Sequence, residues 1–279
     1  MTTLERTDPI PDQSPADIIT AAEASVPALL RHTWIQTQRL LLRWVRDPVT
    51  LLETLIVPCL LLLMLDIVVG SQIQKFSGHS ALYGSTPMVT LVGALSGTVA
   101  SGIMLGRERE AGILARFWVL PVHRASGLAA RILAEGCRIF CGTVVIILFG
   151  MALGFRFREG PLAAFAFLWI PVLFGLAFAT MVTAIAVFTA KATLVEGVAL
   201  LSSLLMFFST GFVPIGAYPN WIQPVVRGQP MSVAVDTMRA LAEGGPLAAP
   251  LVKTVAWCVG LIVVFALPAG YGYRRASRR

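Results

Sequence analysis

The chain has 279 residues, of which 56% are hydrophobic and only 13% charged, and its mean hydropathy is +0.77. Soluble domains carry about 25% charged residues because their surfaces face water, so this composition excludes a soluble globular protein. The formal charge of +7 does not call for nucleic acid as a partner, because basic residues at the cytoplasmic face of a membrane protein give the same excess.

Residues 1–27 are polar, rich in proline and acidic, and they lack the basic start and apolar core of a secretory signal. We therefore expect a disordered cytoplasmic tail. Residues 28–47 have the pattern of a two-faced helix, with basic side chains three or four positions apart and an apolar stripe opposite. Such a helix lies in the membrane plane with its arginines toward anionic lipid headgroups. The side chains that define this surface helix are Trp34, Arg39, Arg43 and Arg46.

Six apolar segments follow, near the length of about 20 residues that crosses the hydrocarbon core. They are Val49–Gly70, Thr86–Gly106, Leu128–Gly154, Leu162–Ala190, Glu196–Phe212 and Leu251–Tyr271. An even number puts both termini on one side, which is cytoplasmic because most of the 22 Lys and Arg fall there. The predicted fold is an all-α polytopic protein of the plasma (inner) membrane, with six spans over residues 48–273 and a basic cytoplasmic tail over 274–279.

Two connecting segments differ from ordinary loops. Residues 107–127 begin with four alternating charges and continue as an amphipathic sequence on the cytoplasmic side. Residues 214–250 are interrupted by prolines, yet they are too apolar for a solvated loop. We expect extracellular re-entrant or interfacial helices there, one of them over Met231–Ala242, because non-helical backbone at membrane depth must be shielded by protein.

The sequence lacks the parts of several membrane machines. It contains no H-E-x-x-H metalloprotease motif and no G-x-x-x-x-G-K-[ST] phosphate loop, and its three histidines lie in unrelated segments. We expect no metal site and no cofactor in this chain. Arg131, Glu135 and Arg138 are spaced to pair on the cytoplasmic half of the third span, and no charge is clearly central. A proton- or sodium-coupled carrier therefore lacks its usual relay. A set of small residues instead predicts a close helix-packing face: Gly93, Gly97, Ser101, Gly102 and Gly106.

Three groups of residues carry a family resemblance. They are Arg107, Glu108, Arg109 and Glu110 with Gly112, Leu114 and Pro121; Phe207–Pro214 with Tyr218–Trp221; and Gln229-Pro230, where the family commonly has Asn-Pro. With these residues the chain resembles the permease subunits of type-2 ABC exporters over nearly its whole length after the tail. It is most similar to the daunorubicin-resistance type, which includes mycobacterial permeases linked to export of phthiocerol dimycocerosates.

The resemblance implies roles for the two unusual segments. Residues 28–47 resemble the family's connector helix, and residues 107–127 resemble the coupling helix that rests in a groove of the ATPase subunit. On the residues alone, a solvated positive-inside loop explains the same charges. Residues 214–250 resemble extracellular gate helices. The implied coupling residues are Arg107, Glu108, Arg109, Glu110, Gly112, Leu114, Arg116 and Pro121. The implied gate residues are Phe212, Pro214, Pro219, Trp221, Gln229 and Pro230.

The implied partners are a dimeric ABC ATPase subunit, which binds ATP and Mg²⁺, and a second permease, homologous or identical, because six spans are half of the usual pathway. The chain by itself is then not an enzyme. We expect the exporter to move a hydrophobic lipid or polyketide, such as a phthiocerol dimycocerosate-type lipid, or a drug such as an anthracycline. Export of a polysaccharide or glycolipid is an alternative that the sequence does not separate. A membrane enzyme or scaffold is a further alternative, which turnover by this chain alone would support.

Overall fold

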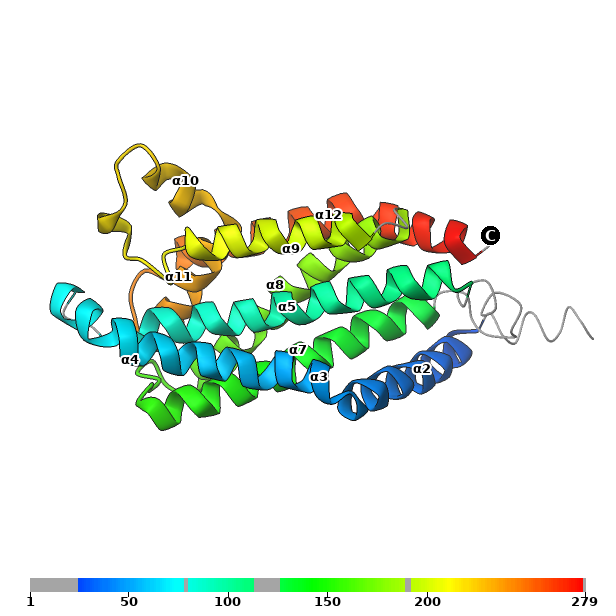
Figure 1. Cartoon of the computed structure of the whole chain (residues 1–279), viewed down its shortest axis with the longest axis horizontal. Coiled ribbons are helices and arrows are strands. Elements are labelled where there is room, and N and C mark those ends of the chain that lie inside the picture. Colours follow the sequence, from blue (N-terminus) through cyan, green and yellow to red (C-terminus); the bar gives the residue numbers. More distant parts are fainter. Residues whose placement is uncertain (1–24, 78–79, 113–125, 189–191, 278–279) are drawn as a thin grey trace, which may run out of the picture.

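Long helices lie side by side in the computed structural model, which describes residues 25–77, 80–112, 126–188 and 192–277 (Figure 1). Five helices within these ranges are long and apolar enough to cross a membrane: Pro48–Gln74, Leu82–Glu110, Ser126–Leu153, Pro161–Phe188 and Ala248–Gly272. The described residues hold no strand. The predicted all-α multi-pass architecture is therefore confirmed. Of the tail predicted over residues 1–27, residues 1–24 lie outside the described residues. Ser25 caps α2, and Val26 begins it.

The helix that was predicted to lie in the membrane plane is separated from the first long apolar helix by a capped break. Helix α2 spans Val26–Arg46, and Asp47 then accepts hydrogen bonds from the backbone N–H groups of Val49 and Thr50 at the start of α3, Pro48–Leu51. These bonds hold the pKa of Asp47 below its ordinary value, the side-chain hydroxyl of Thr50 contributing most. The span continues as a π-helical turn over Leu52–Ile56 and as α4 over Val57–Ser77.

The centre of the bundle is α5, Leu82–Glu110, which packs against α4, α7, α8, α9 and α11. Its small residues make this close packing possible. A Cβ at Gly93 would lie 3.2 Å from Ile146 Cδ1, and one at Gly102 would lie 2.3 Å from Val182 Cγ1. The predicted packing face is therefore confirmed at these two glycines, whereas Gly106 has no neighbour within 4 Å.

Three further long helices complete the bundle. They are α7, Ser126–Leu153; α8, Pro161–Phe188; and α12, Ala248–Ser277. Helix α8 lies between α5 and α12 and packs against both. The predicted basic tail over residues 274–279 is helical as far as Ser277, because α12 runs past the predicted end of the last span. The described chain ends at the same end of the bundle as α2 (Figure 1).

The segment predicted to form the fifth span ends early. Helix α9 covers Ala192–Phe207, and the chain then turns, so the expected helix over Glu196–Phe212 is wrong in its last turn. At about 1.5 Å per residue α9 is about 24 Å long, shorter than the roughly 30 Å hydrocarbon core. It is a shorter apolar helix, and the sixth crossing stays a prediction.

The proline-rich segment after α9 folds into short helices at the other end of the bundle, as Figure 1 shows. They are the 3₁₀ turn Ile215–Ala217, α10, Gln223–Gly228, and α11, Pro230–Glu243. Helix α11 corresponds to the short helix predicted over Met231–Ala242. It is buried against α5, α8 and α12, so protein shields it from surrounding lipid or water.

The two glycines of α5 provide a matched test of this packing. We expect Gly102→Ala to lower the stability by about 1–3 kcal/mol, because the new methyl group collides with Val182 in a close-packed core. Gly106→Ala has open space and should be neutral or add about 0.5–1 kcal/mol through helix propensity. Thermal unfolding of the purified protein in detergent measures both. Equal effects of the two substitutions would contradict the packing of α5 on α8.

Candidate functional site

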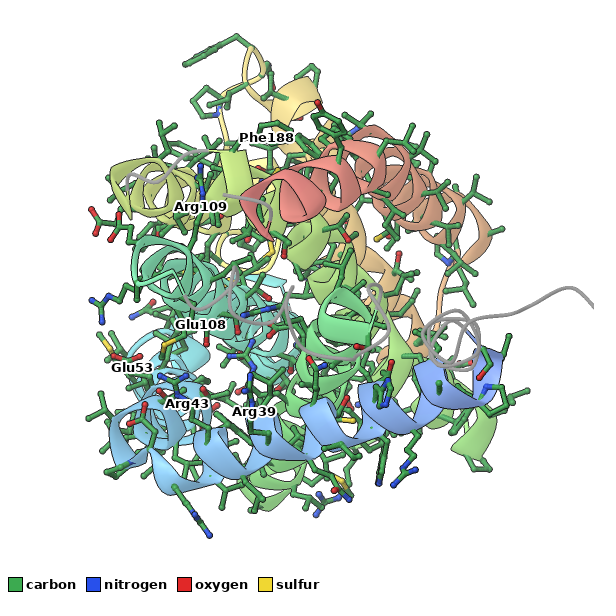
Figure 2. All side chains as sticks on the ribbon, turned by 90° about the vertical axis from the view of Figure 1, so that its right-hand side faces the viewer. Arg39, Arg43, Glu53, Glu108, Arg109 and Phe188 are labelled. Carbon is green, nitrogen blue, oxygen red and sulfur yellow. The ribbon has the colours of Figure 1, made fainter. Side chains whose placement is uncertain are left out.

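A buried carboxylate joins three helices at the end of the bundle that carries α2. Glu108, in the last turn of α5, is only 5% exposed. Its Oε1 accepts a hydrogen bond from Arg43 Nη1 of α2 at 3.2 Å, and its Oε2 accepts one from Arg131 Nη2 of α7. Figure 2 shows Arg43 reaching from α2 toward Glu108. We call Glu108, Arg43 and Arg131 the clasp.

The two arms of the clasp differ in their surroundings. The Arg43 side chain is 57% exposed, so its ion pair contributes at most about 1 kcal/mol. The Arg131 side chain is 17% exposed and faces a carboxylate that is almost entirely buried. Removing one partner of a buried pair leaves an uncompensated charge, which costs about 3–5 kcal/mol. Arg131 is therefore the stronger arm, and it ties α5 to α7.

The other charges of the predicted coupling segment have different positions. Arg107 and Glu110 are exposed, while Arg109 is half-buried. Helix α5 continues through Glu110, so the predicted loop begins as helix. Gly112 follows with φ +68°, a left-handed conformation that favours glycine and ends the helix. The remaining predicted coupling residues, Leu114, Arg116 and Pro121, lie outside the described residues.

A second polar group lies deeper between α5 and α7. Glu135 is 6% exposed, and its two oxygens accept hydrogen bonds from Thr98 Oγ1 at 2.7 Å and Ser101 Oγ at 2.8 Å. It also forms an ion pair with Arg138, which is 5% exposed. A Cβ at residue 97 would lie 1.9 Å from Arg138 Nη1, so Gly97 leaves the space that the guanidinium fills. We call Glu135, Arg138, Thr98 and Ser101 the inner network.

The inner network changes the predicted pairing of the charges on the third span. The predicted pairing of Glu135 with Arg138 is confirmed, but Arg131 binds Glu108 of another helix. Arg138 is about 18 Å along α7 from its first residue, at about 1.5 Å per residue. A charged pair therefore lies well inside the span, held by hydroxyl donors of α5. The Thr98 and Ser101 hydroxyls were not predicted as its partners. Ser101 lies four residues after Gly97 and Thr98 lies four residues before Gly102, which places them on the predicted packing face and was the available signal.

At the opposite end of the bundle, the Gln229 side chain caps the C-terminal end of α9. Gln229 Nε2 donates hydrogen bonds to the backbone oxygens of Leu205 and Phe208, at 3.2 and 2.6 Å, and to Ser232 Oγ at 2.9 Å. The last carbonyls of a helix have no partner within the helix, so Gln229 supplies the missing donor. This predicted gate residue thereby fixes α11 to the end of α9.

Sequence reasoning missed a second contact in the predicted gate segment. Thr210 donates to Asp236 Oδ1 at 2.8 Å, and Arg239 donates to the backbone oxygen of Thr210 at 2.9 Å. Burial raises the pKa of Asp236 above its ordinary value, while the Thr210 hydrogen bond and the charges of Arg239 and Arg227 act in the opposite direction. These side chains lie on α11 and in the turn after α9, two segments with no spacing signal between them.

The other predicted gate residues lie around this contact. Phe212 packs edge-on against Phe207, with ring centroids 5.6 Å apart. Pro214 precedes the 3₁₀ turn, and Pro230 begins α11. Trp221 is 78% exposed and Pro219 is exposed as well. An exposed tryptophan beside apolar helices is typical of a membrane–water interface.

Comparison with known proteins shows that the groups described at both ends of the bundle fall within one matched protein family. The family model described as "ABC-2 type transporter" matches residues 31–242, which is well over half of the chain. The chain belongs to the ABC-2 type transporter family. The matched range includes the clasp, the inner network and α11 except for its last residue, Glu243, so the residues described above lie within the part of the chain that matches the ABC-2 family.

Individual relatives agree with this family assignment. The chain is 46% identical over 246 residues to the probable doxorubicin resistance ABC transporter permease protein DrrC of Mycobacterium tuberculosis, covering 88% of this chain and 89% of that protein. It is 28% identical over 272 residues to the daunorubicin resistance ABC transporter permease protein DrrB1 of Streptomyces coeruleorubidus, covering 95% and 93%. The doxorubicin resistance permease DrrB of M. tuberculosis is 27% identical over 192 residues, 65% of each chain. The resemblance drawn from the sequence is thereby confirmed.

The unequal arms of the clasp can be measured in this ABC-2 permease. We expect Arg131→Gln to lower the free energy of unfolding several-fold more than Arg43→Gln, because only Arg131 is shielded from solvent. Double-mutant cycles with Glu108→Gln, followed by denaturation in detergent, give the two coupling energies. Arg227→Gln, an exposed arginine of α10, is the control and should change little. Similar couplings for Arg43 and Arg131 would show that burial does not set the strength of the clasp.

Proposed function

We propose that this chain is the membrane-spanning permease subunit of an ATP-driven exporter in the plasma (inner) membrane, with both termini cytoplasmic. A dimeric ABC ATPase subunit binds ATP and Mg²⁺ in this proposal, and a second permease, identical or homologous, completes the pathway. The observation that carries the proposal is the clasp. It joins α2, α5 and α7 at the start of the segment 107–127, which is the candidate contact with the ATPase.

The clasp suggests how that contact would move the spans. Closure of the ATPase dimer acts on residues 107–127, where Arg107 and Glu110 are exposed and available for contact. Glu108 points into the bundle and transmits this movement to α2 and α7, so its role is internal rather than direct contact. A change of conformation requires contacts that differ between the two states, and the exposed charges would supply them.

The pairing of permeases is supported by the surface of the chain. Helix α9 has large apolar side chains that are more than half exposed, among them Leu200, Leu201 and Leu204. A face of this kind fits lipid or a neighbouring permease. The M. tuberculosis relatives DrrB and DrrC are both permeases. Helix α2 stretches across the end of the bundle in Figure 2, as expected for a connector helix that lies against membrane lipids.

The cargo in this proposal is a hydrophobic molecule, either a lipid or polyketide of the phthiocerol dimycocerosate type or a drug such as an anthracycline. The relatives carry doxorubicin and daunorubicin resistance in their names, which supports the drug. The buried helix α11, fixed to α9 by Gln229, supports a gate at the outer end through which an amphiphile would leave. Opening this gate requires the Gln229 and Thr210 contacts to break.

The coupling role is tested by reversing the exposed charges while keeping the clasp. In Arg107→Glu/Glu110→Arg the net charge is unchanged and Glu108 remains paired. We expect co-purification of the ATPase and ATP-driven transport to fall about tenfold or more, as for loss of charge-assisted contacts across an interface. Lys253→Glu, an exposed charge at the start of α12, is the control and should retain both. Purified complexes without any ATPase, or undiminished transport by the double variant, would overturn the proposal.

The cargo is tested in cells that lack this protein. If the cargo is a lipid, one surface-exposed lipid should disappear from the extracted profile and accumulate inside, and the wild-type gene should restore it. If the cargo is a drug, the lipid profile should stay unchanged while intracellular anthracycline rises. A strain in which neither the lipids nor drug accumulation change would contradict both forms of the proposal.

A further inference from the structure

The end of the bundle that carries α2 encloses a partly open cavity of about 300 Å³. Helices α2, α5, α7, α8 and α12 all contribute to its wall, which is mostly apolar. Both the clasp and the inner network line it. Sites for small organic molecules have volumes of about 300–1,000 Å³, with apolar walls and a few convergent polar groups. The cavity therefore has the size and lining of a site for one polar group and a short apolar segment.

The hydrogen bonding inside the cavity is unbalanced in favour of donors. Both oxygens of Glu108 accept from arginines, and both oxygens of Glu135 accept from hydroxyl groups of α5. Arg138, in contrast, is 5% exposed and its Nε is buried without a hydrogen-bond partner among the described residues. A guanidinium has five N–H donors and no acceptor. An unpaired buried donor costs about 1–3 kcal/mol, so a rotation of the Arg138 side chain that turns this N–H toward the cavity would be stabilised by a ligand with acceptor oxygens.

The charged groups of the wall offer free donors rather than free acceptors. Arg43, Arg131 and Arg138 lie in the wall with the carboxylates of Asp47, Glu108 and Glu135, so the formal charges of the wall balance. Figure 2 shows Arg39 and Arg43 on the side of α2 that faces Glu108. The Asp47 carboxylate, also in the wall, is already occupied by the N–H groups and hydroxyl that cap α3. Since the carboxylate oxygens are already hydrogen-bonded and a guanidinium has five N–H donors, the groups left free in this wall favour a ligand that brings acceptor oxygens.

The apolar part of the wall indicates how such a ligand would arrive. Leu40, Leu41 and Trp44 come from α2, most of whose other large apolar side chains are exposed, and Ile262 comes from α12, a helix with a largely exposed apolar surface. An amphiphile in the adjoining leaflet could thus place its chain along α2 and α12 while its headgroup reaches Arg138. A soluble ion has no apolar chain, so it would gain no binding free energy from these apolar side chains.

We propose that this cavity binds the anionic headgroup of a membrane amphiphile, whose phosphate or carboxylate oxygens accept hydrogen bonds from Arg138 and Arg131. The first carbons of its chain pack against Leu41, Trp44 and Ile262. The site lies within one permease subunit, between the helices that the clasp joins. It does not depend on which molecule the exporter carries, or on the presence of an ATPase.

Native mass spectrometry of the full-length chain, purified with whatever subunits accompany it, tests this site. The probes are short-chain phosphatidylglycerol, phosphatidylcholine of the same chain length, and inorganic phosphate. We expect retention of phosphatidylglycerol about tenfold above phosphatidylcholine, the factor expected for charge-assisted hydrogen bonds, and no competition by inorganic phosphate at equal concentration. Equal retention of the two lipids, or equally tight binding of free phosphate, would overturn the headgroup assignment.

Two variants and a control locate the binding. Ala179→Leu, on α8, extends a side chain into the cavity and leaves every charge in place, and we expect it to reduce phosphatidylglycerol retention about tenfold. Glu135→Gln/Arg138→Gln removes the charges together, so that no unpaired buried charge remains, and should reduce retention similarly. Ala164→Leu makes the same substitution on α8 away from the cavity and should bind normally.

The variants also separate this inference from the proposed function. If Ala179→Leu unfolds in detergent, the double variant carries the test, since it adds no volume. Unchanged lipid retention in a folded cavity variant would refute the site. A complex that binds the lipid as expected but lacks an ATPase, or fails to transport, would refute the exporter proposal and leave the cavity site standing.

Discussion

The buried carboxylate of Glu108 is the constraint on which the arrangement of the α2 end depends. A charge that is 95% removed from solvent is tolerated only when it is paired, and its two partners come from α2 and α7. The positions of both helices are therefore fixed relative to the last turn of α5. Helix α2 otherwise exposes much of its apolar face, so its packing on α7 mainly decides where it lies, and the exposed Arg43 pair adds at most about 1 kcal/mol.

The second polar layer makes the same pair of helices rigid at greater depth. Glu135 and Arg138 of α7 meet Thr98 and Ser101 of α5, so α5 and α7 are joined by charges near their ends and again inside the span. Hydrogen bonds of this kind are stronger in a low-dielectric interior, and a partly satisfied network is costly there. Sliding of α5 along α7 would break both layers at once. The two helices are thus expected to move together.

Much of this organisation could be predicted from the sequence, and the failures have physical causes. Apolar length located the long helices. The charges after Gly106 were expected in a loop, but Arg and Glu are good helix formers, so α5 continues to Glu110. The early end of α9 depends on Gln229, which lies 22 residues further along. Local patterns carry no signal for such contacts, nor for the pairing of Arg131 with Glu108.

Helix α5 connects the two ends of the molecule. Its last turn holds the clasp, and near its first turn a Cβ at Gly84 would lie 2.9 Å from Arg239 Nη2 and 3.2 Å from the backbone oxygen of Gly211. At about 1.5 Å per residue these ends are about 40 Å apart, roughly the thickness of a bilayer with its headgroups. A tilt of α5 that displaces Glu108 must therefore also displace Gly84 against Arg239 of α11. Because Gly84 has no side chain to deform, the movement reaches Arg239 and the turn after α9 directly, and in the proposed exporter this is the route from the ATPase contact at one face to the gate at the other.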